Sequence, residues 1–224
     1  MMEQQTYNLT DLNLERALLT CLFTDIYATD AYRELQGVVV EDDFTTDEHR
    51  QVWQIICKTY DQGKGLSPLN MYLTSCDMGI TLNAGDVAYR CNTVTLSGSD
   101  NLEDCIMTDY SAGEITSEES RQLIEAMDKA FRTDKVELHP GISYRHCLVL
   151  RDADTGAQLT PPHDISRKPV KGHLPEGQNG KLLREMMEYS YSVLKDHPVN
   201  QKRVAEGKNP ANCLWFWGEG RKPA

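Results

Sequence analysis

The sequence lacks several patterns that mark well-defined classes of protein. It contains no GxSxG, HExxH or P-loop lysine motif, which argues against the hydrolase, metalloprotease and nucleotide-binding classes that these motifs identify. No apolar run approaches the roughly 18 residues that a membrane-spanning helix requires. The N-terminal stretch is polar and carries Glu3, unlike a secretory signal peptide. We therefore expect a cytoplasmic protein that makes no contact with a membrane.

Cysteine pairs with metal-binding spacing are also missing. The seven cysteines, at positions 21, 57, 76, 91, 105, 147 and 213, include no CxxC pair, and their number is odd. Neither a disulfide framework nor a zinc ribbon is indicated, so reduced thiols are expected. No Asp and His pattern resembles a dinuclear metal site, which draws several ligands from separate loops. The residues therefore predict no metal ligand and no catalytic nucleophile.

The charge is acidic overall but unevenly distributed along the 224 residues. Residues 1–66 carry five Lys and Arg against 12 Asp and Glu, a net charge of −7. Residues 67–164 have a net charge of −9, and residues 165–224 a net charge of +5. An acidic N-terminal part is a poor phosphate binder, so we expect no direct nucleic-acid contact there. The basic part could attract a small anion, or could simply form a solvated charged surface.

The N-terminal part has the periodicity of a small all-helical unit. One predicted helix is capped by Asp11 and presents an apolar face made of Leu14, Ala17, Leu18, Cys21 and Leu22. A second, shorter helix is expected around residues 32–35. Thr45 and Glu48 form a capping-box pattern. It opens a third helix with an apolar side of Val52, Trp53, Ile56 and Tyr60, which Gly63 and Gly65 end.

The pattern changes after residue 66. Residues 67–77 have no clear period and contain Pro68, so we place a junction there. Strands are then predicted at 86–96, 142–150 and 213–217. Helices are predicted after a Thr116–Glu119 capping box and at 181–195. The predicted fold class is α+β, with the helical unit at 1–66 followed by an α/β-layered domain at 78–224 that has a mixed or antiparallel sheet.

Four residues in the second part could bind an anion or transfer a proton. Arg90 and Arg145 lie within predicted strands, and an arginine can hold a phosphate or carboxylate with two parallel hydrogen bonds. The alternative is an arginine on the solvent face or in a salt bridge. His163 and Asp164 follow two prolines that stiffen their loop, so they could orient a substrate or donate a proton. Alternatively, they form a turn in which Asp164 caps the next segment of the chain.

Six sequence words in the second part occur in a fixed order. They are GDVAYRCNTVTL (85–96), DYSAGEI (109–115), HPGISYRHCLVL (139–150), LTPPHDI (159–165), LKDHPVNQKR (194–203) and GKNPANCLWFWGEGR (207–221). Together they resemble the segment that archaeal-type, cofactor-independent phosphoglycerate mutases insert into a phosphatase-like core. The resemblance implies a core with two divalent metal ions (Mn, Mg or Zn) and a serine that becomes phosphorylated. The inserted domain closes over that site, and its basic residues hold the phosphoglycerate.

Carried over motif by motif, the resemblance makes Arg90, Arg145, His163 and Asp164 the candidate substrate-binding residues. Many members of the family have arginines in the DYSAGEI word, where this chain has Ser111 and Glu114. The family's metal ligands and phosphorylated serine lie before and after this segment. We therefore expect a part of a phosphoglycerate mutase, an isomerase of glycolysis, that binds phosphoglycerate weakly but holds no metal and is inactive alone.

The first part has a different resemblance. The words LERALLTCLFTD (14–25) and DDFTTDEHRQVWQII (42–56) are similar to the helical N-terminal domain of DnaB-type replicative DNA helicases. That resemblance implies ring assembly and primase contact, and here possible self-association through residues 1–66. Two alternatives to the mutase function are therefore open. The chain could act as a helicase-like oligomerisation or docking module, or it could be a non-functional fused fragment.

Overall fold

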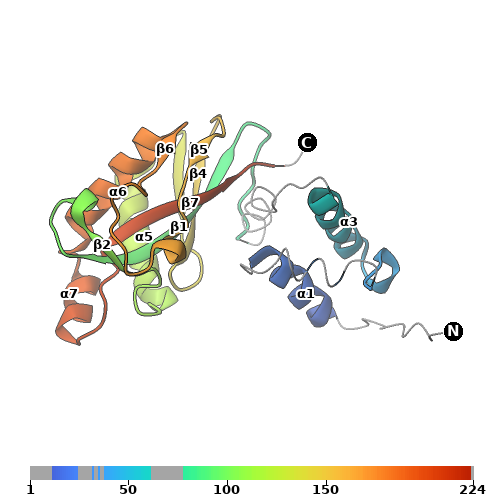
Figure 1. Ribbon diagram of the computed structural model, residues 1–224, viewed down its shortest axis with the longest axis horizontal. Helices are drawn as coiled ribbons and strands as arrows, with labels where there is room; N and C mark the ends of the chain where they lie inside the picture. Colours follow the sequence, from blue (N-terminus) through green and yellow to red (C-terminus); the bar gives the residue numbers. More distant parts are fainter. Residues whose placement is uncertain (1–11, 25–31, 33–34, 36–37, 62–77, 223–224) are drawn as a thin grey trace. The chain divides into compact units, whose positions relative to one another are not determined.

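The computed structural model describes residues 12–222 except 25–31, 33–34, 36–37 and 62–77 (Figure 1). Contacts between residues divide the chain into two compact units, residues 1–70 and 71–224. The predicted junction at 67–77 lies outside the described residues. Within the described ranges, no helix is long and apolar enough to cross a membrane.

The first unit is helical, as expected. Its elements are α1 (Leu12–Thr24), the 3-10 helix η1 (Glu41–Asp43) and α3 (Asp47–Asp61). Trp53 of α3 is buried, and its ring centroid lies 5.6 Å from that of Phe44 and 6.2 Å from that of Tyr32. Ile56 and Leu22 are also buried. The aromatic residues therefore form much of a small core, because each buries a large apolar area.

The predicted apolar face of α1 is wrong in part. The helix buries Glu15, Leu19 and Leu22, whereas Leu14 and Ala17 are exposed. The reason is the Glu15 carboxylate, which accepts hydrogen bonds from the Thr45 backbone N–H at 2.9 Å and from its hydroxyl. It also lies 2.6 Å from His49 Nδ1. The Asp11 cap and the side chain of Cys21 lie outside the described part.

The start of α3 is also shifted by one residue from the predicted capping box. The Oγ1 of Thr46 accepts the N–H of His49 at 3.2 Å, so Thr46 is the residue that caps the helix. The Thr45 hydroxyl instead donates to the Glu15 carboxylate. Trp53 and Ile56 are buried as predicted. The side chain of Tyr60 and the glycines after the helix are not described.

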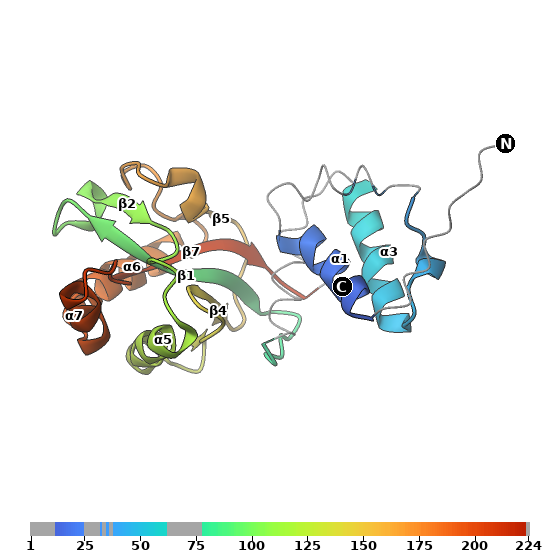
Figure 2. The ribbon, with the colours of Figure 1, turned by 90° about the horizontal axis from the view of Figure 1, so that it is seen from below.

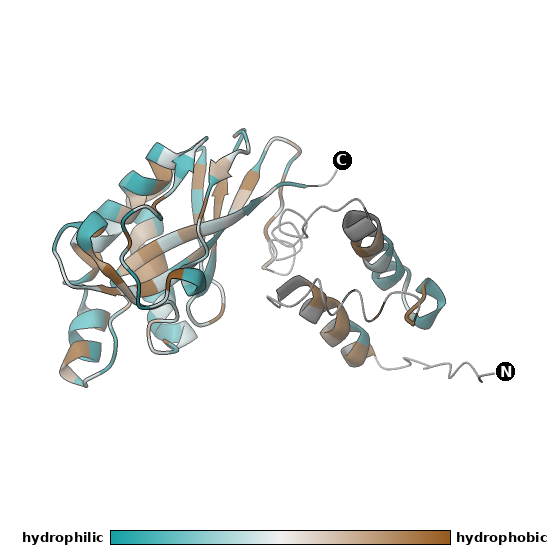
Figure 3. Cartoon of the chain, in the orientation of Figure 1, coloured by the Kyte–Doolittle hydropathy of each residue, from teal (hydrophilic) through white to brown (hydrophobic). Residues whose placement is uncertain are grey.

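The second unit is built around one antiparallel sheet. Its strands are β1 (Val87–Ser97), β2 (Ile106–Asp109), β3 (Val136–His139), β4 (Arg145–Leu150) and β7 (Cys213–Gly220). β1 pairs with β2, β4 and β7, and β3 pairs with β4. Hydrophobic residues are concentrated on these strands (Figure 3). The α+β fold class and the antiparallel sheet are confirmed; β2 and β3 were not predicted.

Helices and short elements surround the sheet. They are α5 (Ser117–Phe131), α6 (Gly180–Leu194), α7 (Pro198–Ala205), β5 (Ala157–Gln158), β6 (Glu176–Gly177), η2 (Leu102–Asp104) and η3 (Pro162–Ile165). The capping box at the start of α5 is confirmed, since Thr116 Oγ1 accepts the N–H of Glu119. α5 lies on one side of the sheet and the segment with η3 on the other (Figure 2).

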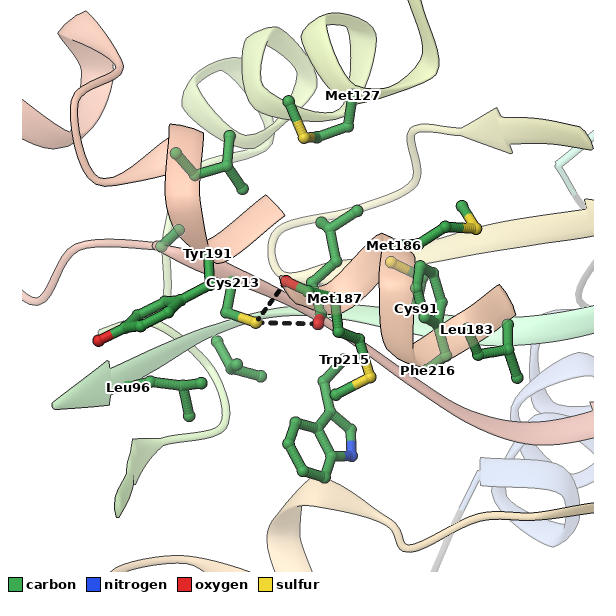
Figure 4. Packing of buried hydrophobic residues seen from close by; sticks show 14 of the residues in the cluster. Cys91, Leu96, Met127, Leu183, Met186, Met187, Tyr191, Cys213, Trp215 and Phe216 are labelled. Atoms are coloured by element: carbon green, nitrogen blue, oxygen red, sulfur yellow. Dashed lines mark hydrogen bonds between the residues drawn. The ribbon is translucent and has the colours of Figure 1, made fainter. Parts of the chain in front are cut away.

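α6 packs along β7 and protects that strand. Its residues Leu183, Met186 and Met187 are buried over the sheet (Figure 4). Ser190 Oγ accepts the N–H of Leu214 at 2.9 Å, so α6 supplies a hydrogen bond that another strand would otherwise provide. Leu182 of the same helix does not join this core, because it is 38% exposed.

The predicted strand at 142–150 begins three residues late. Ile142 is 72% exposed, Ser143 has a φ of 54°, and the N–H of Arg145 bonds to the Ile142 carbonyl. These residues therefore form a turn, because a left-handed backbone cannot continue a strand. From His146 to Leu150 every residue is buried, so both faces of β4 are covered.

Candidate functional site

Strand register places the two predicted arginines on one face of the sheet. Asn92 of β1 lies opposite Arg145 of β4, and Arg90 lies opposite Cys147. Directly opposed residues of antiparallel strands share a face, so Arg90 and Arg145 do as well. β1 also pairs with β7, and there Trp217 lies opposite Arg90. His163 is carried by η3, which covers this face of the sheet.

Each arginine stacks on an aromatic ring. The Arg90 guanidinium carbon lies 4.8 Å from the ring centroid of Trp217, and that of Arg145 lies 5.0 Å from the ring centroid of Tyr144. Such contacts are favourable because the ring face is electron-rich. A planar guanidinium stacked in this way keeps its N–H groups at its edge, where they can bind a carboxylate or a phosphate.

A continuous chain of rings joins the two arginines. The His163 ring meets Trp217 edge to face with centroids 5.3 Å apart, and it meets Tyr110 at 6.3 Å. Tyr110 in turn meets Tyr144 edge to face at 6.0 Å. We call this set the arginine–aromatic cluster; its members are Arg90, Tyr110, Tyr144, Arg145, His163 and Trp217. Three of the four residues predicted from sequence therefore lie in it.

Asp164 lies at the margin of the cluster. Its side chain is 59% exposed, and its Oδ1 is 3.5 Å from His163 Nε2. Lys168 Nζ donates to its backbone carbonyl at 2.8 Å. Asp164 sits inside the η3 turn, with its own N–H bonded to the Pro161 carbonyl. Asp164 therefore lies in a turn, which is one part of the alternative, and its carboxylate is close to His163.

The charges in the cluster are mainly two like-charged guanidinium groups. Partial burial lowers the pKa of Arg90, and the positive charge of Arg145 lowers it further. The pKa of the Tyr144 phenol is raised, mainly by burial. The charge of Arg145 acts against this rise, and the Glu114 carboxylate adds to it. Repulsion between two nearby cations is relieved when an anion binds between them. The arrangement is therefore suited to an anionic ligand.

The loop after β2 is held by internal hydrogen bonds. Asp109 accepts from the N–H and hydroxyl of Ser111, both at 2.8 Å, from the N–H of Gly113 and from the side-chain amide of Asn209. Burial opposes this ionised state, but the hydrogen bonds outweigh it and lower the pKa of Asp109. The backbone N–H and the hydroxyl of Ser111 are thus both engaged within the loop.

The same loop contains three successive left-handed residues. Ala112, Gly113 and Glu114 have φ values of 49°, 65° and 51°. This conformation costs about 1–2 kcal/mol for each residue that is not glycine. Arg203 of α7, which is only 2% exposed, donates to the Ala112 carbonyl at 2.6 Å. A buried arginine therefore holds the strained loop that positions Tyr110.

A shallow cleft of about 580 Å³ opens beside Tyr110. It is lined mostly by polar residues: Ile106, Thr108, Asp109, Tyr110, Ser111, Ser166, Arg167 and Asn209. Because Tyr110 belongs to both, the cleft adjoins the arginine–aromatic cluster. The cleft could admit a polar ligand that extends from the arginines.

The described residues do not fit a divalent metal site. Among them, no three His, Cys, Asp or Glu side chains converge in a way that could hold a metal ion. The carboxylate of Asp109 is already bonded to four donors. No chemical step is therefore assigned to a metal on the described part of this chain.

Comparison with known proteins identifies the family. Residues 60–200 match the profile of the 2,3-bisphosphoglycerate-independent phosphoglycerate mutases. The chain belongs to this family. It is 47% identical over 153 residues to the phosphoglycerate mutase of Methanosarcina acetivorans, a match that covers 67% of this chain and 37% of that protein. With the mutase of Methanothrix thermoacetophila it shares 43% identity over 152 residues, which are 68% of this chain and 36% of that one.

A solved mutase structure has the same fold. The cofactor-independent phosphoglycerate mutase of Thermoplasma acidophilum superposes with a TM-score of 0.54 at 22% identity, covering 67% of this chain and 40% of that one. This chain thus spans less than half the length of the relatives that it matches. Residues 7–106 also match the profile of the DnaB-like helicase N-terminal domain, which overlaps the mutase match from residue 60.

Sequence reasoning missed half of the arginine–aromatic cluster. Tyr110, Tyr144 and Trp217 lie in the words DYSAGEI, HPGISYRHCLVL and GKNPANCLWFWGEGR, but no local pattern shows that their rings meet. For the pair of Tyr144 and Arg145, the sequence did offer a signal, because the two residues are adjacent in the chain. Trp217 meets Arg90 only through strand pairing, which the sequence does not specify by itself.

Proposed function

We propose that this chain supplies the phosphoglycerate-binding part of a cytoplasmic, cofactor-independent phosphoglycerate mutase. The observation that carries the proposal is the convergence of Arg90, Arg145 and His163 on one face of the sheet. Family membership supports it, because the relatives act on phosphoglycerate by name. The proposal gives the described residues a role in binding only, and not in the phosphoserine and metal chemistry of the whole enzyme.

The ligand carries a phosphate and a carboxylate, and the cluster offers two guanidinium groups. One arginine can hold each anionic group with charge-assisted hydrogen bonds. His163 lies between them in the chain of rings and can donate or accept a hydrogen bond at the ligand's hydroxyl. Asp164, through its contact with His163, would influence that histidine's orientation. These residues bind and orient the ligand, which is the contribution that positioning makes to a reaction.

Binding can be tested by NMR chemical-shift titration of the full chain with 3-phosphoglycerate. We expect weak binding, in the millimolar range at best, that salt weakens. Arg90→Ala and Arg145→Ala should each lower the affinity by about 10-fold or more, because a charge-assisted hydrogen bond contributes about 1.5–3 kcal/mol. Arg121→Ala is the matched control, since Arg121 is exposed on α5. Equal effects of all three variants would contradict the proposed site.

Arg145→Lys separates charge from geometry. Lysine keeps the positive charge but loses the planar, two-pronged donor set and the flat stack on Tyr144. If Arg145 holds an anionic group with two parallel bonds, this variant should bind nearly as weakly as Arg145→Ala. Affinity equal to that of the unaltered chain would mean that Arg145 contributes only a diffuse charge.

A second candidate function is self-association through the first unit. It is favoured by the match to the DnaB-like helicase N-terminal domain and by exposed leucines on α1, namely Leu12 at 50% and Leu14 at 56%. Sedimentation of the full chain over a range of concentrations tests it. Under this alternative, oligomers form and Leu14→Glu abolishes them, whereas Leu182→Glu on α6 does not. A monomer at all concentrations would exclude it.

A further inference from the structure

Asn92 lies at the centre of the arginine–aromatic cluster without belonging to the sequence-predicted set. On β1 it is opposite Arg145 of β4 and opposite Trp215 of β7, so its side chain emerges on the face that carries both arginines. It is only 3% exposed. Burying an amide is unfavourable unless its polar atoms are bonded. An asparagine at this position therefore requires specific partners.

The Asn92 side chain has partners on both sides of the cluster. Its Oδ1 accepts the indole Nε1–H of Trp217 at 2.9 Å, and its Nδ2 donates to the backbone carbonyl of Tyr110 at 3.1 Å. Trp217 provides the ring on which Arg90 stacks, and Tyr110 provides the ring between His163 and Tyr144. One amide thus links the two supports of the cluster.

We propose that Asn92 is a positioning residue for phosphoglycerate binding. Its hydrogen bond to Trp217 fixes the plane of the indole, and so the direction in which Arg90 presents its N–H groups. Its hydrogen bond to the Tyr110 carbonyl fixes the loop that brings Tyr110 against His163. This inference rests on the proposed function. Asn92 holds the side chains of the cluster in their binding geometry before the ligand arrives. Less conformational entropy is then lost on binding, which is how preorganisation improves affinity.

A double-mutant cycle with Trp217 tests the inference. Asn92→Ala removes the acceptor, and Trp217→Phe removes the N–H donor while keeping a ring under Arg90. Because ordering one side chain costs about 0.5–1.5 kcal/mol, Asn92→Ala should weaken 3-phosphoglycerate binding about 3- to 10-fold. If the two residues act through one bond, the double variant should bind about as weakly as the weaker single variant. Multiplying effects would overturn the positioning role and leave the proposed function intact.

Two further readouts separate positioning from a general loss of structure. The indole N–H resonance of Trp217 should shift in Asn92→Ala without ligand, while the resonances of α5 and α6 stay in place. Asn92→Asp keeps an acceptor for the indole but adds a carboxylate beside the arginines. It should preserve the indole resonance and yet lower the affinity more than Asn92→Ala does. An unmoved indole resonance in Asn92→Ala would contradict the inference, and an unaltered chain that shows no binding would overturn both proposals.

Discussion

Removing the buried guanidinium of Arg203 should destabilise the second unit strongly. In the folded protein it donates to Glu119 at 2.7 Å, to the Ala112 carbonyl at 2.6 Å and to the Asn209 carbonyl at 2.9 Å. Arg203→Met keeps the apolar stem but leaves these three acceptors without their donor. Removing one partner of a buried pair costs about 3–5 kcal/mol. That loss is a large fraction of the roughly 5–15 kcal/mol by which a domain is stable.

Urea unfolding followed by tryptophan fluorescence can measure this loss. In a Trp53→Phe background, the remaining tryptophans, Trp215 and Trp217, both report on the second unit. Arg132→Met is the control, because Arg132 is 47% exposed and its ion pair with Asp128 lies at the surface. Such a pair contributes about 0–1 kcal/mol. A loss for Arg203→Met within about 1 kcal/mol of the control would refute the reasoning that Arg203 holds the strained loop.

Four more outcomes can be checked. Burial lowers the pKa of His146 to about 3, whereas the pKa of a histidine in an unfolded chain is about 6.5. Protonation therefore favours the unfolded chain as the pH falls below about 6.5. Through this histidine the free energy of unfolding should fall by about 2 kcal/mol between about pH 7 and pH 5, and in His146→Gln the free energy of unfolding should depend correspondingly less on pH. Glu15→Gln should destabilise the first unit by about 1–3 kcal/mol, measured by urea unfolding through Trp53, because it replaces an ionised acceptor for Thr45. Residues 1–66, which have a net charge of −7, should not bind single- or double-stranded DNA oligonucleotides measurably at physiological salt in fluorescence anisotropy. Finally, the chain alone should not interconvert 2- and 3-phosphoglycerate in a coupled enolase assay with manganese, magnesium or zinc added, because its described residues offer no cluster that could hold a charge-stabilising metal ion.

Long elements with strong local signals could be predicted from the sequence, and short ones could not. The Thr116–Glu119 capping box places the start of α5 correctly, and the alternating residues of β1 and the periodic ones of α6 mark those elements. β2 and β3 have four residues each, too few for a period to be evident. In α1 the burial of an acidic residue, Glu15, changed part of the expected face, because its partners come from a segment 30 or more positions away.

The candidate site was predictable in its charged residues but not in their supports. The two arginines stand out because they interrupt apolar strands, and the resemblance to the mutases then suggested what they bind. The roles of Trp217 and Asn92 depend on the register between β1 and β7, and these two residues are 125 positions apart. A one-residue slip would move those side chains to the other face, so no local pattern could assign them.

The pairing of β7 with β1 has a consequence for the order in which the second unit folds. Residues 87–150 hold β1, β3 and β4, which can pair as soon as they leave the ribosome. One neighbour of β1 is missing until residues 213–220 have been made, and pairing of such distant segments is slow. During that interval the edge of β1 that later pairs with β7 presents unpaired backbone N–H and C=O groups to other chains. A chaperone that shields β1 during synthesis should therefore raise the yield of folded protein more than one that acts after release.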